Sequence, residues 1–208
     1  MMKYKEMKAK LEEELSASRF AHTMGVVGTA KQLAKVWETD PKITKKAALL
    51  HDCAKGMPHE ERVAYCTSHG VSVTPAEEEN LTLLHAKCGA IMAHEDYGVD
   101  DWNILHAIAV HTTGSVHMNT LDKIIFVSDY IEPGRDKAPR LDDLRRLSEM
   151  DLDLTVFYIL QDTLEFLNGR SAAVDPTTRA AYEAAAVRAE QEIEEAKVVT
   201  SPDRILFL

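Results

Sequence analysis

The chain has few residues that break or cross-link a polypeptide, and few aromatic residues. Its 208 residues include 9 Gly, 7 Pro and 3 Cys, and aromatic residues make up 6% of the total. The scarcity of glycine and proline favours long regular elements over a series of tight turns. The three cysteines form no Cys-x-x-Cys pair, and their odd number argues against a disulfide framework. A reducing cytoplasm is therefore the expected compartment.

An excess of positive charge and a long apolar run are both missing. The 34 acidic and 24 basic residues give a formal net charge of -10, which repels phosphate backbones, so we expect no nucleic-acid partner. A phosphorylated substrate would need local positive charge at its site. No apolar run approaches the ~20 residues of a membrane span, and the first 15 residues hold no signal-peptide core. We therefore expect no membrane partner.

The remaining composition is that of a folded domain. Apolar residues make up 45% and charged residues 28%, and the length allows one domain with a tail. Nearly every stretch has helical periodicity and none alternates as a strand, so an all-α fold is predicted. Helices are expected at Lys3–Leu15, Arg19–Trp37 (with Ser16 or Ser18 as N-cap), Lys42–Asp52, Pro58–His69, Asn80–Tyr97, Asp101–Thr112, Thr120–Ile131, Leu141–Arg170 with a break near Met150, and Pro176–Lys197, with a loop over Val71–Glu79.

The composition changes after Arg170. Residues 171–208 contain an Ala- and Glu-rich helical segment and end on the apolar residues Ile205–Leu208. A docked terminal helix, an oligomer contact and a partly disordered tail are the alternatives, and a docked helix is the simplest. We therefore expect one domain over residues 1–175 and a C-terminal helix and tail over residues 176–208. The oligomeric state is left open, with a homodimer among the alternatives.

Ionisable residues recur within or just after apolar helical runs. His51 and Asp52 follow the run Ala47–Leu50, where an imidazole and a carboxylate are costly to bury unless they are paired. One such residue is most often a satisfied core histidine, but five separate segments repeat the pattern. Six nitrogen and oxygen ligands exceed a four-coordinate zinc site and suit two transition-metal ions bridged by Asp52. The candidate ligands are His22, His51, Asp52, His85, His111 and Asp129.

The order of these residues resembles that of the HD-domain metal-dependent phosphohydrolases, and the sequence around each of them is most similar to the YqeK family. The matching pieces are SRFAH at 18–22, ALLHDCAK at 48–55, LHAKCGA at 84–90, HTTG at 111–114 and DYIEPGR at 129–135. The resemblance extends over about residues 10–180. It implies an all-helical HD domain with a di-iron centre, and symmetrical cleavage of diadenosine tetraphosphate to two ADP. The expected fold is thus a single HD-domain helical bundle, with the extra C-terminal helix indicated by the composition.

Several cations and hydroxyls near these ligands suit a polyphosphate. Two metal ions clamp a phosphoryl group and lower the pKa of a bound water, with Asp52 and Lys55 as the catalytic candidates. Lys55 follows Asp52 by one turn, and the forked guanidinium of Arg135 follows a Pro-Gly turn. Surface ion pairing is the alternative role for the cations. The candidate substrate-binding residues are Arg19, Lys55, Thr112, Thr113, Gly114 and Arg135.

Two other functions stay open at this point. The HD motifs alone also fit a phosphohydrolase of another nucleotide or of a guanosine polyphosphate. A non-catalytic HD module that binds a nucleotide is the alternative from a different class, although the presence of all six ligands counts against it. The donor set accepts iron, manganese, cobalt or zinc, and iron follows from the resemblance alone.

Overall fold

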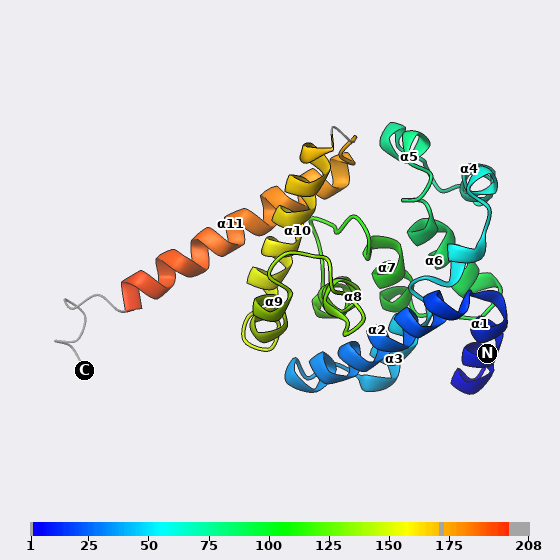
Figure 1. The fold of residues 1–208 in the computed structure, drawn as a ribbon, viewed down its shortest axis with the longest axis horizontal. Helices are drawn as coiled ribbons and strands as arrows, with labels where there is room; N and C mark the ends of the chain where they lie inside the picture. Colours follow the sequence, from blue (N-terminus) through cyan, green and yellow to red (C-terminus); the bar gives the residue numbers. More distant parts are fainter. Residues whose placement is uncertain (1, 171–172, 200–208) are drawn as a thin grey trace.

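A computed structural model describes residues 2–170 and 173–199, and every regular element within them is a helix, as predicted (Figure 1). The apolar end Ile205–Leu208 lies outside the described residues. The elements are α1 (Tyr4–Glu14), α2 (Ala17–Val36), α3 (Pro41–Leu50), a 3₁₀ helix η1 (Cys53–Gly56), α4 (His59–Ser68), α5 (Pro75–Glu79), α6 (His85–Glu95), α7 (Trp102–Val110), α8 (Thr120–Ile131), α9 (Leu141–Leu147), α10 (Leu152–Gly169) and α11 (Pro176–Val199).

Side-chain caps set where several helices begin. The Ser16 hydroxyl accepts a hydrogen bond from the backbone N–H of Arg19 at the start of α2. Asp40 does the same for Lys42 in front of Pro41, which starts α3. The predicted break near Met150 is confirmed, because α9 ends at Leu147 and Asp151 caps the first turn of α10. Each cap satisfies a backbone donor that the first helical turn leaves free.

Three predicted boundaries were wrong. The segment Val71–Glu79 is not entirely a loop, because Thr74 and Glu77 form a reciprocal capping box that starts the short helix α5. The helix expected from Asn80 begins only at His85, after a turn. The helix expected to reach Asp52 ends at Leu50, and this early end shapes the site described below.

The core lies where α2, α3, α7 and α8 pack together. α2 packs against α3 and α8, and α7 packs against α3, α6 and α8. Gly89 allows the close approach of α6, because a Cβ there would lie 3.3 Å from Ile108 Cγ2 and 3.5 Å from the carbonyl oxygen of His51. The helices that carry the predicted metal ligands are therefore the central ones.

α11 is docked on α10 through its first part, up to Ala189. Ala181, Ala185 and Ala189 are buried, and the Tyr182 ring stacks on Phe157 with the ring centroids 5.5 Å apart. Figure 1 shows the C-terminal half of α11 extending beyond α10 and away from the other helices. None of the described helices is both long and apolar enough to cross a membrane.

Candidate metal centre

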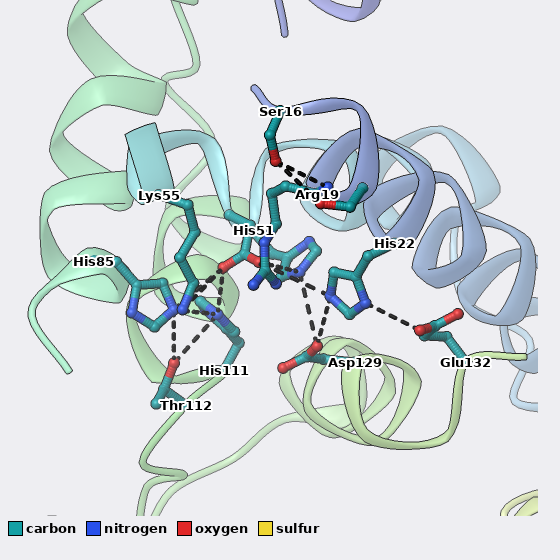
Figure 2. Close-up of polar contacts among 12 residues, drawn as sticks. Ser16, Arg19, His22, His51, Lys55, His85, His111, Thr112, Asp129 and Glu132 are labelled. Atoms are coloured by element: carbon teal, nitrogen blue, oxygen red, sulfur yellow. Dashed lines mark hydrogen bonds and ion pairs between the residues drawn. The ribbon is translucent and has the colours of Figure 1, made fainter. Parts of the chain in front are cut away.

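The six predicted ligands converge at one place inside the bundle. Figure 2 shows His22, His51, His85, His111 and Asp129 gathered there. They come from five segments that are far apart in the sequence. His22 lies within α2, His51 and Asp52 directly follow α3, His85 opens α6, His111 directly follows α7 and Asp129 lies near the end of α8. The fold thus brings together all the residues that the ionisable pattern singled out.

The early end of α3 allows two consecutive residues to face the same centre. Successive helical side chains point about 100° apart, but the backbone leaves helical geometry at Asp52, with φ -109° and ψ 18°. The side chains of His51 and Asp52 therefore both point into the centre. His51 is 0% exposed and Asp52 is 2% exposed.

Asp52 lies between two groups of histidine nitrogens and faces each group with a different oxygen. Its Oδ1 is 3.2 Å from His85 Nε2 and 3.5 Å from His111 Nε2. Its Oδ2 is 3.5 Å from His51 Nε2 and 3.8 Å from His22 Nε2. A carboxylate that presents one oxygen to each of two nitrogen clusters has the placement of a ligand shared by two ions.

Three of the four rings are held by backbone carbonyl oxygens. Each uses the carbonyl three residues earlier: His51 with Ala48 (2.7 Å), His85 with Thr82 (2.5 Å) and His111 with Ile108 (2.7 Å). A carbonyl oxygen only accepts hydrogen bonds, so each Nδ1 carries the hydrogen. In a neutral ring the Nε2 lone pair then points into the centre, as a metal ligand requires.

The resulting arrangement of acceptors fits bound cations. Nε2 of His85 lies 3.1 Å from Nε2 of His111, and Nε2 of His22 lies 2.9 Å from Oδ1 of Asp129. Within the described residues, buried atoms without a hydrogen-bond partner include Nε2 of His22 and His51 and Oδ1 of Asp52. Facing acceptors of this kind are stabilised by a shared proton or cation. Imidazole nitrogens and carboxylate oxygens are the donors that divalent transition metals accept.

The electrostatics favour ionised carboxylates at Asp52 and Asp129 and a neutral ring at His85, which are the forms that bind metals, but they favour a proton on His51. Burial alone would raise the pKa of Asp52 and Asp129, but the charges and hydrogen bonds of the histidines outweigh it and hold both pKa values below the usual range. Burial lowers the pKa of His85 to about 4, so this ring is neutral at pH 7. Burial is the largest influence on His51 and opposes its protonation, but the charges of Asp52 and Asp129 and the hydrogen bonds to Asp52 and Ala48 together outweigh it and raise the pKa of this ring.

Three predicted cations lie against the ligand carboxylates. Arg19 Nη1 donates to Asp52 Oδ2 at 2.8 Å, and Arg135 Nη2 donates to Asp129 Oδ1 at 2.8 Å. Lys55 Nζ lies 3.9 Å from Asp52 Oδ1, and burial lowers the pKa of its ammonium. Three cations of this acidic chain therefore lie at the centre. A groove of about 490 Å³ opens beside it, lined by Ser18, Ala21, His22, Gly25, Glu132, Pro133 and Gly134.

The residues of the HTTG segment (His111–Gly114) have two different environments, one beside the centre and one away from it. Thr112 Oγ1 lies 3.1 Å from His85 Nε2 and 3.2 Å from His111 Nε2, beside the centre. The Thr113 hydroxyl instead donates to the carbonyl oxygen of Gly114. The N–H of Gly114 donates to Val110, and a Cβ there would meet Ala181 of α11 at 3.1 Å. The Gly114 amide is therefore paired within the chain, and the phosphate contact expected from it stays a prediction. The glycine is required by its φ of +68° and by its close approach to α11.

Two buried residues near the centre were missed from the sequence. Glu132 is 4% exposed, and its Oε1 accepts a hydrogen bond from Nδ1 of His22 at 3.1 Å. Its position three residues after Asp129, on the same helical face, is a signal that could have found it. Arg62 is 1% exposed and donates to the carbonyl oxygens of Lys55, Met57 and Leu81.

Known proteins are similar to this chain over most of its length. The HD domain family matches residues 19–134. A Bacillus subtilis (strain 168) protein named "Bis(5'-nucleosyl)-tetraphosphatase, symmetrical" is 37% identical over 183 residues, which cover 87% of this chain and 96% of that protein. A protein of the same name from Halalkalibacterium halodurans is 36% identical over 172 residues, which cover 83% of this chain and 91% of that protein.

A solved structure shares the fold as well. It is the 1.50 Å crystal structure of a protein from Clostridium acetobutylicum, described as a "predicted HD superfamily hydrolase involved in NAD metabolism". The TM-score is 0.87 at 34% sequence identity, and the match covers 90% of this chain and 99% of that one. The likeness therefore includes both the arrangement of the helices and nearly the whole length of the neighbour.

Proposed function

This chain belongs to the HD-domain family, and from that premise we propose that it hydrolyses diadenosine tetraphosphate symmetrically to two ADP at the centre around Asp52. Relatives of nearly the same length carry the name of that activity. The observation that carries the proposal is the position of Asp52, whose two oxygens face two separate groups of histidine nitrogens. This placement suits the two-ion phosphohydrolase chemistry that the family resemblance implies.

Six side chains would hold the ions. One ion would take His22, His51, Asp52 and Asp129, and the other would take Asp52, His85 and His111. When bound, the two ions polarise a phosphoryl oxygen and make hydroxide available near neutral pH. We propose iron as the metal on the strength of the family resemblance, because this donor set also accepts manganese, cobalt and zinc.

The cations of the chain bind and orient the substrate. Symmetrical hydrolysis breaks a P–O bond between the second and third phosphates, and the oxygen of water forms the new bond to phosphorus. Negative charge grows on the nonbridging and leaving oxygens as this bond breaks. Lys55, mostly buried beside Asp52, is placed to neutralise charge at the reacting phosphate. Arg19 and Arg135, half exposed at the rim, are placed to bind the outer phosphates through their forked donors.

The surroundings support a free nucleotide as the substrate. The net charge of -10 opposes binding of a nucleic-acid backbone, and the positive side chains Arg19, Lys55 and Arg135 gather at one centre. Free thiols at Cys53, Cys66 and Cys88 are compatible with a reducing cytoplasm. We propose that residues 1–175 form the catalytic domain and that residues 176–208 form the C-terminal helix and tail.

Product analysis tests this function. The purified protein is incubated with diadenosine tetraphosphate and Mn²⁺ or Fe²⁺, and the nucleotides are separated by chromatography. ADP as the only product supports the proposal, and ATP with AMP contradicts the symmetrical register. Tight binding without cleavage would favour the non-catalytic module. Asp129→Ala should abolish turnover, whereas His59→Ala, an exposed residue at the start of α4, should not.

A further inference from the structure

His22 differs from the other three histidines of the centre in the partner of its Nδ1. The other rings donate to a backbone carbonyl three residues earlier. His22 lies well inside α2, where carbonyl oxygens accept the hydrogen bonds of the helix. Its Nδ1 instead donates to Oε1 of Glu132, at the end of α8. Figure 2 shows the His22 ring lying between Asp129 on one side and Glu132 on the other.

The Glu132 carboxylate is held in place by two glycines that leave room for it. Its Oε2 accepts a 2.6 Å hydrogen bond from the N–H of Gly134. A Cβ on Gly134 would lie 3.0 Å from both carboxylate oxygens, and a Cβ on Gly25 would lie 2.4 Å from Oε2. Gly25 is one turn from His22 on the same helix, so the space that the carboxylate occupies exists only because position 25 has no side chain.

We propose that Glu132 is a positioning residue that prepares His22 to bind metal, an inference that rests on the metal centre proposed above. The carboxylate oxygen of Glu132 accepts only, so it favours the tautomer with the hydrogen on Nδ1, against the competing acceptor Asp129 on Nε2. In that tautomer the Nε2 lone pair is directed at the centre, where a metal would bind it. A carboxylate that accepts the Nδ1 hydrogen also makes Nε2 more basic, and so a stronger metal ligand, than a backbone carbonyl in the same position does. Gly25 and Gly134 serve this contact by leaving the carboxylate its place.

The structural role of residue 132 is carried by different atoms. Its backbone N–H donates to Ser128 at the end of α8, and its carbonyl oxygen accepts from Arg145. A substitution of the side chain leaves these backbone contacts in place. The carboxylate itself contacts His22 and Gly134. Side-chain variants therefore separate positioning of His22 from support of the fold.

A pair of glycine variants gives the sharpest comparison. Gly25→Ala and Gly28→Ala add the same helix-favouring methyl group to α2, but a Cβ at Gly28 meets nothing within 4 Å. Only Gly25→Ala must displace the far end of the Glu132 side chain. We expect Gly25→Ala to bind Mn²⁺ roughly 10–100-fold more weakly by titration calorimetry. Gly28→Ala should bind like the wild type, and equal affinities in both variants would overturn the proposal.

Glu132 variants test the same contact from its other side. Glu132→Ala should weaken Mn²⁺ binding roughly 10–100-fold, and the double variant with Gly25→Ala should be no weaker than Glu132→Ala alone. Glu132→Gln offers one carbonyl oxygen to two donors, from His22 and Gly134, so its affinity should be intermediate. Additive losses in the double variant would contradict a shared mechanism.

A spectroscopic measurement reads the positioning without any metal. Nitrogen-15 spectra of the metal-free protein at about pH 8, above the ordinary pKa of imidazole, report which nitrogen of each ring carries the hydrogen. Because Asp129 Oδ1 lies 2.9 Å from Nε2 of the same ring, the expected result is a difference: less of the His22 ring should carry its hydrogen on Nδ1 in Glu132→Ala than in the wild type. An unchanged spectrum would overturn this inference. A wild type that binds Mn²⁺ but leaves diadenosine tetraphosphate intact would overturn the proposed function and not this one.

Discussion

His85 and His111 point their Nε2 atoms at each other across 3.1 Å, while the Nδ1 of each ring donates to a backbone carbonyl of its own turn. The carbonyl bonds assign the ring hydrogens to Nδ1, so both facing atoms are acceptors when the rings are neutral. Burial lowers the pKa of His85 to about 4, which disfavours a proton as the shared partner near neutral pH. A metal ion held with Asp52 would satisfy both rings.

Metal content is the first prediction. Purified protein should carry close to two transition-metal ions per chain by elemental analysis, and Asp52→Ala should lower both because it faces both histidine groups. His111→Ala should mainly lower the occupancy of the ion proposed at Asp52, His85 and His111. The exposed His59→Ala should leave the content of both ions unchanged. Full activity of protein stripped of metal would contradict the proposed centre.

The second prediction separates the phosphate-binding cations from the metal ligands. Lys55→Ala and Arg135→Ala should keep the fold and the metal, because protonated side chains do not ligate ions. Removing one fixed charge at a reacting phosphate costs roughly 10²–10³ in rate, about 2.7–4 kcal/mol. Lys55→Ala should mainly lower kcat, since Lys55 lies beside Asp52 and is largely buried. Arg135→Ala, 43% exposed in its side chain, should mainly raise KM.

Circular dichroism and elemental analysis of the same two variants supply the control. Unchanged steady-state kinetics in both would mean that the cations are no more than ion-pair partners of Asp52 and Asp129. Loss of metal in either variant would mean that its side chain supports the ligands rather than the substrate.

Arg62 carries the third prediction. Its buried guanidinium donates to the carbonyl oxygens of Lys55, Met57 and Leu81, and so ties η1 to the turn before α6. Arg62→Met keeps most of the volume but leaves these acceptors unsatisfied. We expect a loss of about 3 kcal/mol in the free energy of unfolding by urea, together with a lower kcat because Lys55 loses its support. The exposed Arg146→Met should cost less than about 0.5 kcal/mol.

The ligand set could be predicted because its signal is local in the sequence. Charged groups such as His51 and Asp129 stand within apolar helical runs, where burial without a partner is costly. The helices could be predicted for the same reason, because caps and hydrophobic periodicity depend on residues that are close together in the sequence. Thr120–Ile131, for example, has the predicted bounds because Asn119 and Asp122 form a capping box at its start.

The residues that were missed depend on contacts distant in the sequence. Glu132 could be assigned only once α8 was seen to end beside His22 of α2, and Gly25 only once that carboxylate was seen to need its space. The packing of Gly114 could not be predicted either, because it is set by α11, more than sixty residues away in the sequence. A turn motif gives no information about which distant helix covers it.

The last prediction concerns stability at alkaline pH and depends on Tyr97, whose hydroxyl group holds α1 against the rest of the protein. Tyr97 is fully buried, and its hydroxyl donates to Glu14 Oε2 of α1 at 2.7 Å. Burial, and then the hydrogen bond to the Glu14 carboxylate, raise the pKa of the Tyr97 phenol well above its ordinary value of about 10. Above that pH the unfolded chain loses a proton that the folded chain keeps.

Because the folded state then binds more protons, this tyrosine lowers the free energy of unfolding as pH rises above about 10 and has no such effect below it. The contribution is at most about 1.4 kcal/mol per pH unit. Tyr97→Phe should cost about 1 kcal/mol at pH 7 through the lost hydrogen bond, but lose stability less steeply than the wild type as pH rises above about 10. Urea unfolding followed at neutral and alkaline pH measures both effects. Parallel losses in the two proteins would show that the Tyr97 phenol ionises in the folded state as readily as in the unfolded chain.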